Sequence, residues 1–196
     1  MARKISDESL DQLFLSARSH HAWMRKDVDE ELLYKLYDIG KWGPTSANSN
    51  PARLIFVKSA PSKEKLYPAL MGSNVDQVRS APVTVIVAQD MEFYENYPRL
   101  MPEADARSWF AGNPPVIEAT AFRNSSLQGA YFILAARALG LDVCPMSGFD
   151  NSKVDELFLG GTKWKSNFIF TLGYGDESKL FPRGPRLEFS EVAKII

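Results

Sequence analysis

Hydrophobic residues recur at helical intervals in two segments near the start of the chain. In the first segment we expect an N-cap at Ser6, because its side chain can accept a hydrogen bond from the first turn. The apolar face of this helix follows the i, i+3, i+4, i+7 spacing and comprises Leu10, Leu13, Phe14 and Ala17. The second helix is predicted to follow Asp29 and to end at Gly40 or Gly43, since glycine commonly terminates helices. Its predicted inward face comprises Leu32, Leu33, Leu36 and Ile39.

Short apolar runs bounded by turn residues predict four strands, at residues 54–59, 82–90, 141–144 and 167–175. The run 82–90 is nearly continuous in apolar residues, which indicates a strand buried on both faces. Further helices are predicted at residues 63–71, 116–139 and 152–158, and Gly140 is placed to end the longest of them. That helix is apolar on most faces, so we expect it in the core or at a contact between subunits.

Two segments have neither helical nor strand periodicity. Residues 43–53 read GPTSANSNPAR, and this connector is either a solvated linker or a shaped polar surface that holds a ligand. Residues 91–115 mix aromatic, acidic and proline residues, and loops of this length are often functional, for example as lids. Because helices and strands otherwise alternate, the sequence predicts one α/β or α+β domain over residues 1–196.

Composition narrows the classes of function. The 196 residues are 45% hydrophobic and 24% charged, with a formal net charge of -1. This balance gives no electrostatic reason to expect nucleic acid or an anionic membrane as a partner. No apolar run approaches the roughly 20 residues of a membrane-spanning helix. The acidic, amphipathic N-terminus does not resemble a secretory signal, and a single cysteine suits a reducing compartment, so we expect a cytoplasmic protein.

Several familiar sites are absent from the sequence. The stretch GYGDES lacks the third glycine of a dinucleotide fingerprint, and no phosphate-binding P-loop occurs. Zinc prefers clustered histidine and cysteine, but the chain offers only His20, His21 and Cys144, so no metal site is expected. A nucleophilic pair of Cys144 with a histidine is formally possible, although a small buried residue at the end of a strand is the favoured interpretation of this cysteine.

What remains is a set of polar and basic clusters far apart in the sequence. ARSHHAW contains Arg18, Ser19 and His21; GSNVDQ contains Asn74 and Gln77; PMSGF spans Pro145 to Phe149; and FPRGPRL contains Arg183 and Arg186. Each cluster alone has a simpler explanation, such as a helix end, a polar loop or a solvated tail. Together they supply cations for a phosphate and amides for the edge of a heterocycle.

The order of these clusters resembles the nitroreductase family of flavin mononucleotide (FMN) enzymes over the whole chain. In that family an Arg/Ser-rich motif, a PSxxNxQP loop, a PxxGF turn and a basic tail follow one another. Here they read ARSHHAW, PTSANSNP, PMSGF and PRGPR. The stretches KWGPTSAN, DARSWF, AFRNSS and GYGDESKL are most similar to the malonic semialdehyde reductase subgroup. The resemblance implies an α+β fold with a mixed central sheet flanked by helices, in an intertwined homodimer with a tightly bound FMN at the interface.

The resemblance also implies roles for individual residues. The phosphate, ribityl chain and pyrimidine edge of FMN are expected to contact Arg18, Ser19, His21, Asn74, Gln77, Arg183 and Arg186. The connector is expected to reach the flavin of the other subunit through Pro44, Thr45, Ser46 and Asn48. The turn that begins at Pro145 is expected to face flavin N5 and O4 with the N–H groups of Ser147 and Gly148. Three positions depart from common family members, namely Ala52 for Trp, Gln77 for Lys and Ser147 for Glu.

The implied reaction is ping-pong. NADH or NADPH gives a hydride to flavin N5, and an aldehyde then accepts it, so that malonic semialdehyde becomes 3-hydroxypropanoate. The substrate carboxylate calls for an arginine clamp, with Arg53, Arg107 and Arg123 as candidates. Arg107 is favoured because it lies in the lid-like segment, and its alternative is a surface pair with Asp105. No residue stands out as the proton donor, and water is an option.

Two other functions remain open from the sequence. A broad nitroarene or quinone reductase would use the same flavin contacts. A non-catalytic flavin-binding redox module would keep the cofactor but close its face.

Overall fold

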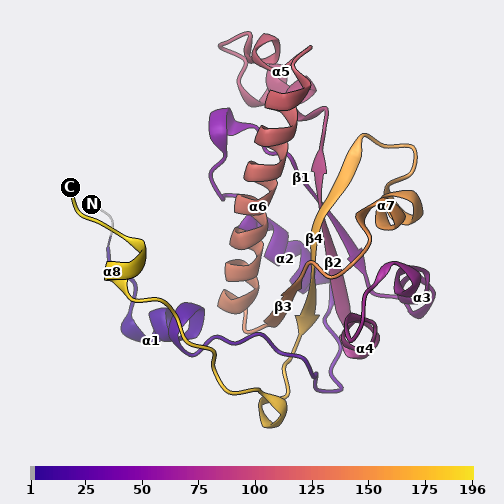
Figure 1. Cartoon of the computed structure of the whole chain (residues 1–196), viewed down its shortest axis with the longest axis vertical. Coiled ribbons are helices and arrows are strands. Elements are labelled where there is room, and N and C mark those ends of the chain that lie inside the picture. The colour runs from indigo at the N-terminus through magenta and orange to yellow at the C-terminus, as the bar shows by residue number, and fades with distance from the viewer. Residues whose placement is uncertain (1–2) are drawn as a thin grey trace.

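The computed structural model describes residues 3–196, and its centre is a four-stranded sheet (Figure 1). The strands lie in the order β1 (Ala52–Val57), β2 (Val83–Asp90), β4 (Trp164–Gly173) and β3 (Asp142–Met146). Neighbouring strands are antiparallel throughout. The expectation of a mixed sheet is therefore wrong for these four strands, which form an antiparallel sheet. The parallel pairing in the described residues is an isolated bridge between Ser19 and Val143, because the N-terminal segment meets β3 at one position.

Helices pack on both faces of this sheet, and further helices lie at the chain ends and before the longest helix. They are α1 (Asp7–Leu10), α2 (Glu30–Gly40), α3 (Ala60–Leu66), α4 (Asn74–Ser80), α5 (Tyr97–Leu100), α6 (Pro114–Ala138), α7 (Asn151–Val154) and α8 (Phe189–Val192). A π-helical turn extends α1 over Asp11–Leu15, and another extends α7 over Asp155–Leu159. Short 3₁₀ turns lie at Ser46–Asn48, Tyr67–Ala69, Phe93–Asn96, Ala106–Trp109 and Glu177–Lys179.

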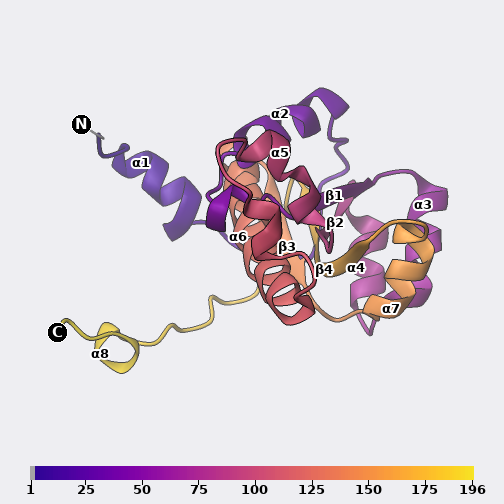
Figure 2. The ribbon, with the colours of Figure 1, turned by 90° about the horizontal axis from the view of Figure 1, so that it is seen from above.

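The sheet is covered on both faces, as Figure 2 shows from above. On one face α2 and α6 pack against Val83, Val85 and Val87 of β2. On the other face α3, α4 and α7 pack in a cluster that includes Ile86 and Ile169. Alternate residues of β2 thus enter opposite cores, and all eight of its residues are buried. The prediction that this strand is buried on both faces is confirmed.

The predicted helix starts agree well with the structure. The Ser6 side chain accepts a hydrogen bond from the Ser9 N–H, and α2 follows Asp29 and ends at Gly40. One predicted inward residue is wrong, because Ile39 is 42% exposed. Helix α4 was missed, since the polar stretch around Asn74 reads as a loop.

The segment expected to be a long loop is folded. It contains α5 and two 3₁₀ turns, and Phe93, Tyr97 and Phe110 form a buried cluster. This cluster packs on Ile117 and Ala121 at the start of α6. The segment therefore has a small core of its own, and that core explains the high aromatic content of the sequence here.

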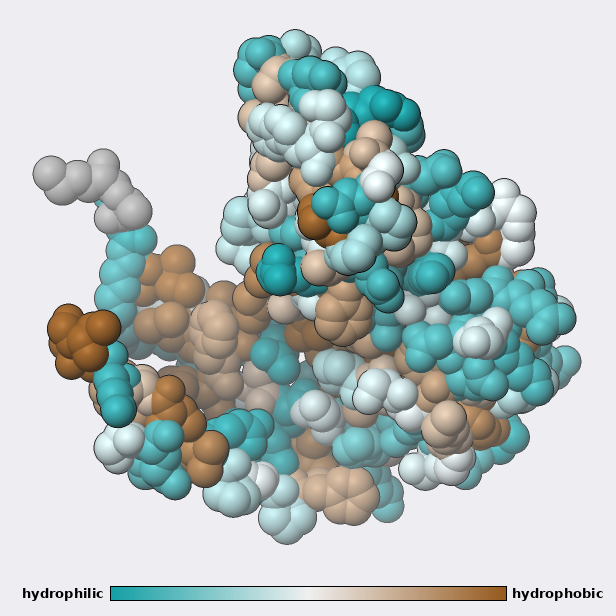
Figure 3. Space-filling model, turned by 45° about the horizontal axis from the view of Figure 1, so that its top comes forward, coloured by the Kyte–Doolittle hydropathy of each residue, from teal (hydrophilic) through white to brown (hydrophobic). Residues whose placement is uncertain are grey.

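Both ends of the chain project from the body as two arms, one carrying α1 and the other α8 (Figure 2). The arms expose large apolar side chains, including Leu15 at 69% and Phe189 at 64%. Figure 3 shows these hydrophobic groups along the arms and around the hollow between them and the body. None of the described helices is long and apolar enough to cross a membrane.

Candidate functional site

A pocket of about 230 Å³ lies where the N-terminal segment meets the C-terminal tail. We call it the arginine pocket, and it is lined by Ala17, Arg18, Ser19, His21, Arg137, Phe181, Pro182, Arg183, Gly184 and Arg186. Five residues predicted to bind the cofactor are thus brought together, although they come from opposite ends of the chain. These are Arg18, Ser19, His21, Arg183 and Arg186.

The guanidinium groups of the arginine pocket bond to main-chain oxygens. Arg18 donates to the carbonyl of Phe181, and Arg183 donates to the carbonyls of Leu15 at 2.7 Å and Ala17 at 3.1 Å. These bonds tie the tail to the N-terminal segment. Because the acceptors are neutral carbonyls, they position the arginines without cancelling their charge.

The charge of the arginine pocket is not neutralised by carboxylates. Among residues 3–196, no ion pair involves any of the four arginines that line it. Four guanidiniums around one cavity favour an anion with several oxygen atoms, because each can donate two charge-assisted hydrogen bonds. The pocket is chemically suited to a phosphate group.

A second group of predicted residues continues from the arginine pocket toward α4. The Nδ1 atom of His21 lies 3.7 Å from the Cys144 sulfur, which in turn lies 3.4 Å from Oε1 of Gln77. Asn74, one turn before Gln77, donates a hydrogen bond of 2.9 Å to the carbonyl of Gly148. The structure therefore connects the arginine pocket to the turn Pro145–Phe149 through side chains in contact.

Cys144 does contact a histidine, but its environment is unfavourable for a nucleophile. The residue is 3% exposed, and burial raises the pKa of its thiol. A raised pKa leaves less thiolate at neutral pH, and the thiolate is the reactive form. The buried, structural interpretation of this cysteine fits the structure better than a catalytic pair.

The connector has an unusual backbone. Ala47, Asn48 and Asn50 all have positive φ, at 48°, 51° and 42°. Asparagine tolerates this region better than most residues, whereas alanine is strained there. Hydrogen bonds hold the shape, since the Asn50 N–H donates to Thr45 Oγ1 and the Asn50 side chain donates to the Asn48 carbonyl. The connector is a fixed surface and not a loose linker.

Helix α6 anchors the connector with two buried amides. Oδ1 of Asn124 accepts a 2.8 Å hydrogen bond from the Ser46 N–H, and Oε1 of Gln128 accepts one of 2.9 Å from the Ala52 N–H. Both amide side chains are at least 95% buried, whereas their backbone donors belong to the partly exposed connector, so each bond joins the surface segment to the interior.

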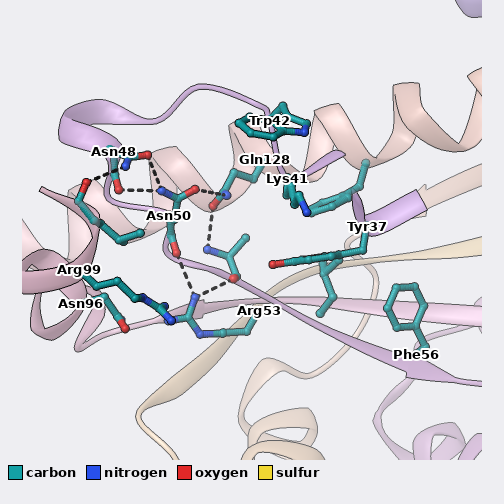
Figure 4. Close-up of a pocket in the computed structure, with 14 residues that line it drawn as sticks. Tyr37, Lys41, Trp42, Asn48, Asn50, Arg53, Phe56, Asn96, Arg99 and Gln128 are labelled. Carbon is teal, nitrogen blue, oxygen red and sulfur yellow. Dashed lines mark hydrogen bonds between the residues drawn. The ribbon is translucent and has the colours of Figure 1, made fainter. Parts of the chain in front are cut away.

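A larger pocket of about 620 Å³ lies beside the connector, as Figure 4 shows. Its lining includes Asn48, Asn50, Arg53, Arg99 and Gln128 together with aromatic residues from several elements, among them Tyr37 of α2. Of the connector residues predicted to reach a flavin, Asn48 lines this pocket, and Pro44, Thr45 and Ser46 line neither pocket. Within one chain the structure does not bring the connector to the arginine pocket.

Of the three arginines considered as clamps for a substrate carboxylate, two are paired with carboxylates of the protein and the third lies on the surface. Arg107 makes two bonds of 2.7 Å to the carboxylate of Glu95, and not to Asp105. This pairing raises the pKa of the Arg107 guanidinium and lowers the pKa of the Glu95 carboxyl. Arg53 bonds to Asp90, and Arg123 lies on the exposed outer face of α6.

Sequence reasoning missed one arginine of the pocket. Arg137 lies in the last turn of α6 and faces the same cavity as Arg18 and Arg183. A basic residue in the last turn of a helix is common because it complements the helix dipole. The sequence therefore gives no signal that separates Arg137 from an ordinary helix-ending cation.

Comparisons with known proteins agree with this fold. The nitroreductase family model matches residues 15–174, which is most of the chain. A relative from Burkholderia lata, provisionally named NADH dehydrogenase/NAD(P)H nitroreductase, is 62% identical over 97% of this chain and 98% of its own length. A relative from Ralstonia nicotianae with the same kind of provisional name is 56% identical over 95% of this chain and 96% of its own length. The chain belongs to the nitroreductase family and is an enzyme of the nitroreductase type.

Solved structures show the same architecture at low sequence identity. A nitroreductase-like protein from Bacillus subtilis superposes with a TM-score of 0.87 at 23% identity, over 97% of this chain and all of that chain. Another from Exiguobacterium sibiricum, solved in complex with FMN, gives a TM-score of 0.86 at 19% identity over both whole chains. The α+β nitroreductase-like fold is confirmed, and the enzyme class sets aside the non-catalytic redox module.

The anchoring of the connector gives a prediction for stability. Replacing the buried Asn124 by Leu removes the acceptor of the Ser46 N–H and the donor to the Thr120 carbonyl, so we expect a loss of about 1–3 kcal/mol in the free energy of unfolding. Urea denaturation followed by fluorescence measures it. The control Glu118→Leu alters an exposed side chain of the same helix, and we expect a change within about 0.5 kcal/mol. Equal stability of Asn124→Leu and the unsubstituted protein contradicts the anchoring role.

Proposed function

We propose that residues 1–196 form a single FMN-binding domain of an NAD(P)H-dependent oxidoreductase that reduces malonic semialdehyde to 3-hydroxypropanoate. The observation that supports FMN as the cofactor is the arginine pocket. It has four guanidiniums, and none of them forms an ion pair with a carboxylate among the described residues. A phosphomonoester supplies the missing negative charge. The FMN complex of the Exiguobacterium relative is consistent with this choice.

The donor set fits the whole cofactor and not its phosphate alone. Arg18, Arg183 and Arg186 are assigned to the phosphate, and Ser19 and His21 to the ribityl chain beside it. The contacts of His21 with Cys144 and of Cys144 with Gln77 extend from the phosphate end toward α4. The amides there, Gln77 and Asn74, are assigned to the pyrimidine edge. FMN, when bound, supplies a hydride carrier between NADH or NADPH and the substrate.

The turn that follows β3 is assigned to the reactive edge of the ring system. Pro145 and Ser147 are exposed, and Gly148 is held by Asn74, so the turn presents backbone at a fixed position. A side chain at Gly148 would meet the Asn74 amide, since a Cβ placed there lies 2.7 Å from Nδ2. Backbone N–H groups position the ring independently of the side chain, which explains why Ser147 can stand where other members have Glu.

We further propose a homodimer in which the connector of one subunit completes the site of the other. The outer face of α6 supports it, because Phe122 is 55% exposed and Leu127 is 46% exposed. The apolar arms support it as well. The assigned connector residues are Pro44, Thr45, Ser46 and Asn48. Their fixed backbone is suited to a wall against a ligand, because little conformational entropy is lost on binding.

Arg107 remains the proposed clamp for the substrate carboxylate. Its present partner is Glu95, and both side chains are about half exposed, at 50% and 46%. Exposed ion pairs contribute little to stability, so a substrate carboxylate can replace Glu95 at small cost. The same bidentate geometry that binds Glu95 would then bind the substrate.

A second candidate function is a broad nitroarene or quinone reductase. The names of the relatives from Burkholderia and Ralstonia favour it, since both include nitroreductase activity. The flavin contacts are the same for both functions, and therefore only the oxidising substrate separates them.

Half-reactions without oxygen separate these functions. We expect NADH or NADPH to bleach the flavin absorbance of the holoenzyme, and malonic semialdehyde to restore it. If nitroarenes or quinones restore the flavin absorbance and the aldehyde does not, malonic semialdehyde is not the substrate, and the assignment of FMN as cofactor still stands. Flavin that NADH and NADPH both fail to reduce would contradict the oxidoreductase proposal as a whole.

The clamp is tested by Arg107→Gln. We expect the KM for malonic semialdehyde to rise about tenfold or more, since hydrogen bonds between charged groups are among the strongest in proteins. Turnover of an uncharged nitroarene should not change. The matched variant Glu95→Gln frees the guanidinium, so its KM for the aldehyde should stay equal or fall. A similar loss with both substrates in Arg107→Gln would argue for a structural role of this ion pair.

A further inference from the structure

Arg137 joins α6 to the N-terminal helix through two hydrogen bonds. The Gln12 side chain donates to the Arg137 carbonyl at 2.7 Å, and Nη1 of Arg137 donates to the Leu13 carbonyl at 3.0 Å. The two residues thereby hold the end of the N-terminal helix against the last turn of α6. This contact explains where the side chain lies, but it uses only one of the N–H groups of the guanidinium.

The rest of the guanidinium is poorly satisfied. Its Nε is buried and has no hydrogen-bond partner among the described residues. Burial also lowers the pKa of the Arg137 guanidinium, with Asp142 acting in the opposite direction. A buried donor without an acceptor is unfavourable. The guanidinium also lines the cavity of the arginine pocket, where an anion would add a favourable charge interaction.

The neighbouring arginine is held in the same manner. Arg183 binds the carbonyls of Leu15 and Ala17, two and four residues after Leu13, whose carbonyl is bound by Arg137. Three carbonyls of the N-terminal segment are thus used to aim two guanidiniums at one cavity. A purely structural tie needs only the carbonyl contacts, and a carboxylate nearby would make it stronger. Such a carboxylate is missing from the lining of the pocket.

We propose that Arg137 is a fourth phosphate-binding residue, which donates charge-assisted hydrogen bonds to the FMN phosphate together with Arg18, Arg183 and Arg186. This inference rests on the proposed function, because it concerns the same flavin. The position of Arg137 in the last turn of α6 favours the charged form of the side chain itself, since the C-terminal end of the helix carries partial negative charge. The residue then discriminates FMN from flavins that lack the phosphate.

The test compares FMN with riboflavin, which has the same ring system and ribityl chain but no phosphate. Flavin-free protein is titrated with each by fluorescence quenching, as the unsubstituted protein, Arg137→Met and Gln12→Ala. We expect Arg137→Met to weaken FMN binding about tenfold or more, as for loss of a charged hydrogen bond, and to leave riboflavin binding unchanged. Gln12→Ala loosens the same helix contact but keeps the guanidinium, so its ratio of FMN to riboflavin affinity should match the unsubstituted protein.

Each other outcome has a distinct meaning. Equal weakening of both flavins in Arg137→Met, or unchanged FMN affinity, would overturn the phosphate role and leave a structural tie, with the proposed function intact. An unsubstituted protein that binds neither flavin would overturn the proposed function itself. If Arg137→Met does not fold, the same titrations on Arg137→Lys decide. A selective loss of FMN affinity there supports the role, because a compact ammonium cannot reproduce the planar fork, and equal or absent changes overturn it.

Discussion

The buried polar side chains of α6 determine how the rest of the molecule presents its candidate site. Asn124 and Gln128 accept hydrogen bonds from backbone N–H groups at both ends of the connector. Without these acceptors, two backbone donors of the connector would lose their partners, and the strained backbone at Ala47 would lose its support. At its other end the same helix holds the N-terminal helix through Arg137. Asn124 and Arg137 are separated by about 20 Å of helix at 1.5 Å per residue. One rigid element thus fixes the relative placement of the connector and the arginine pocket.

The arginine pocket illustrates how charge can be kept available. Carbonyl oxygens hold Arg18 and Arg183 in place, whereas Arg53 and Arg107 are held by carboxylates. The first arrangement leaves net positive charge in a cavity, and mutual repulsion between the guanidiniums makes it less stable without a ligand. An anion that binds there stabilises the fold by mass action, because it binds the folded chain alone. We therefore expect cofactor binding and the order of the two chain ends to be coupled.

Much of the fold could be predicted from local patterns, and the exceptions have physical causes. The apolar continuity of β2 and the residues that bound α2 are local signals, and both agree with the structure. Helix α4 was not predicted, because a seven-residue helix with one buried side chain, Val78, has too little hydrophobic periodicity to detect. The segment before α6 read as a loop because its aromatic residues pack on one another and on Ile117, which is a tertiary effect.

The candidate site was predictable in its members but not in its pairings. Motif order identified five residues of the arginine pocket, since motifs record residue type and sequence position. It could not identify Arg137, because its role depends on the meeting of α6 with both chain ends. Nor could it predict that Arg107 pairs with Glu95 and not with Asp105, since the choice between two nearby carboxylates is made by the 3₁₀ turns around them.

The most direct test of the central claim is the visible absorption spectrum of the purified protein, before and after addition of FMN. The account predicts a yellow protein with a flavin spectrum, and a cofactor that is released on denaturation and proves to be FMN. A colourless, folded protein that takes up no added FMN would contradict it, because the arginine pocket would then lack the ligand to which its charge is assigned.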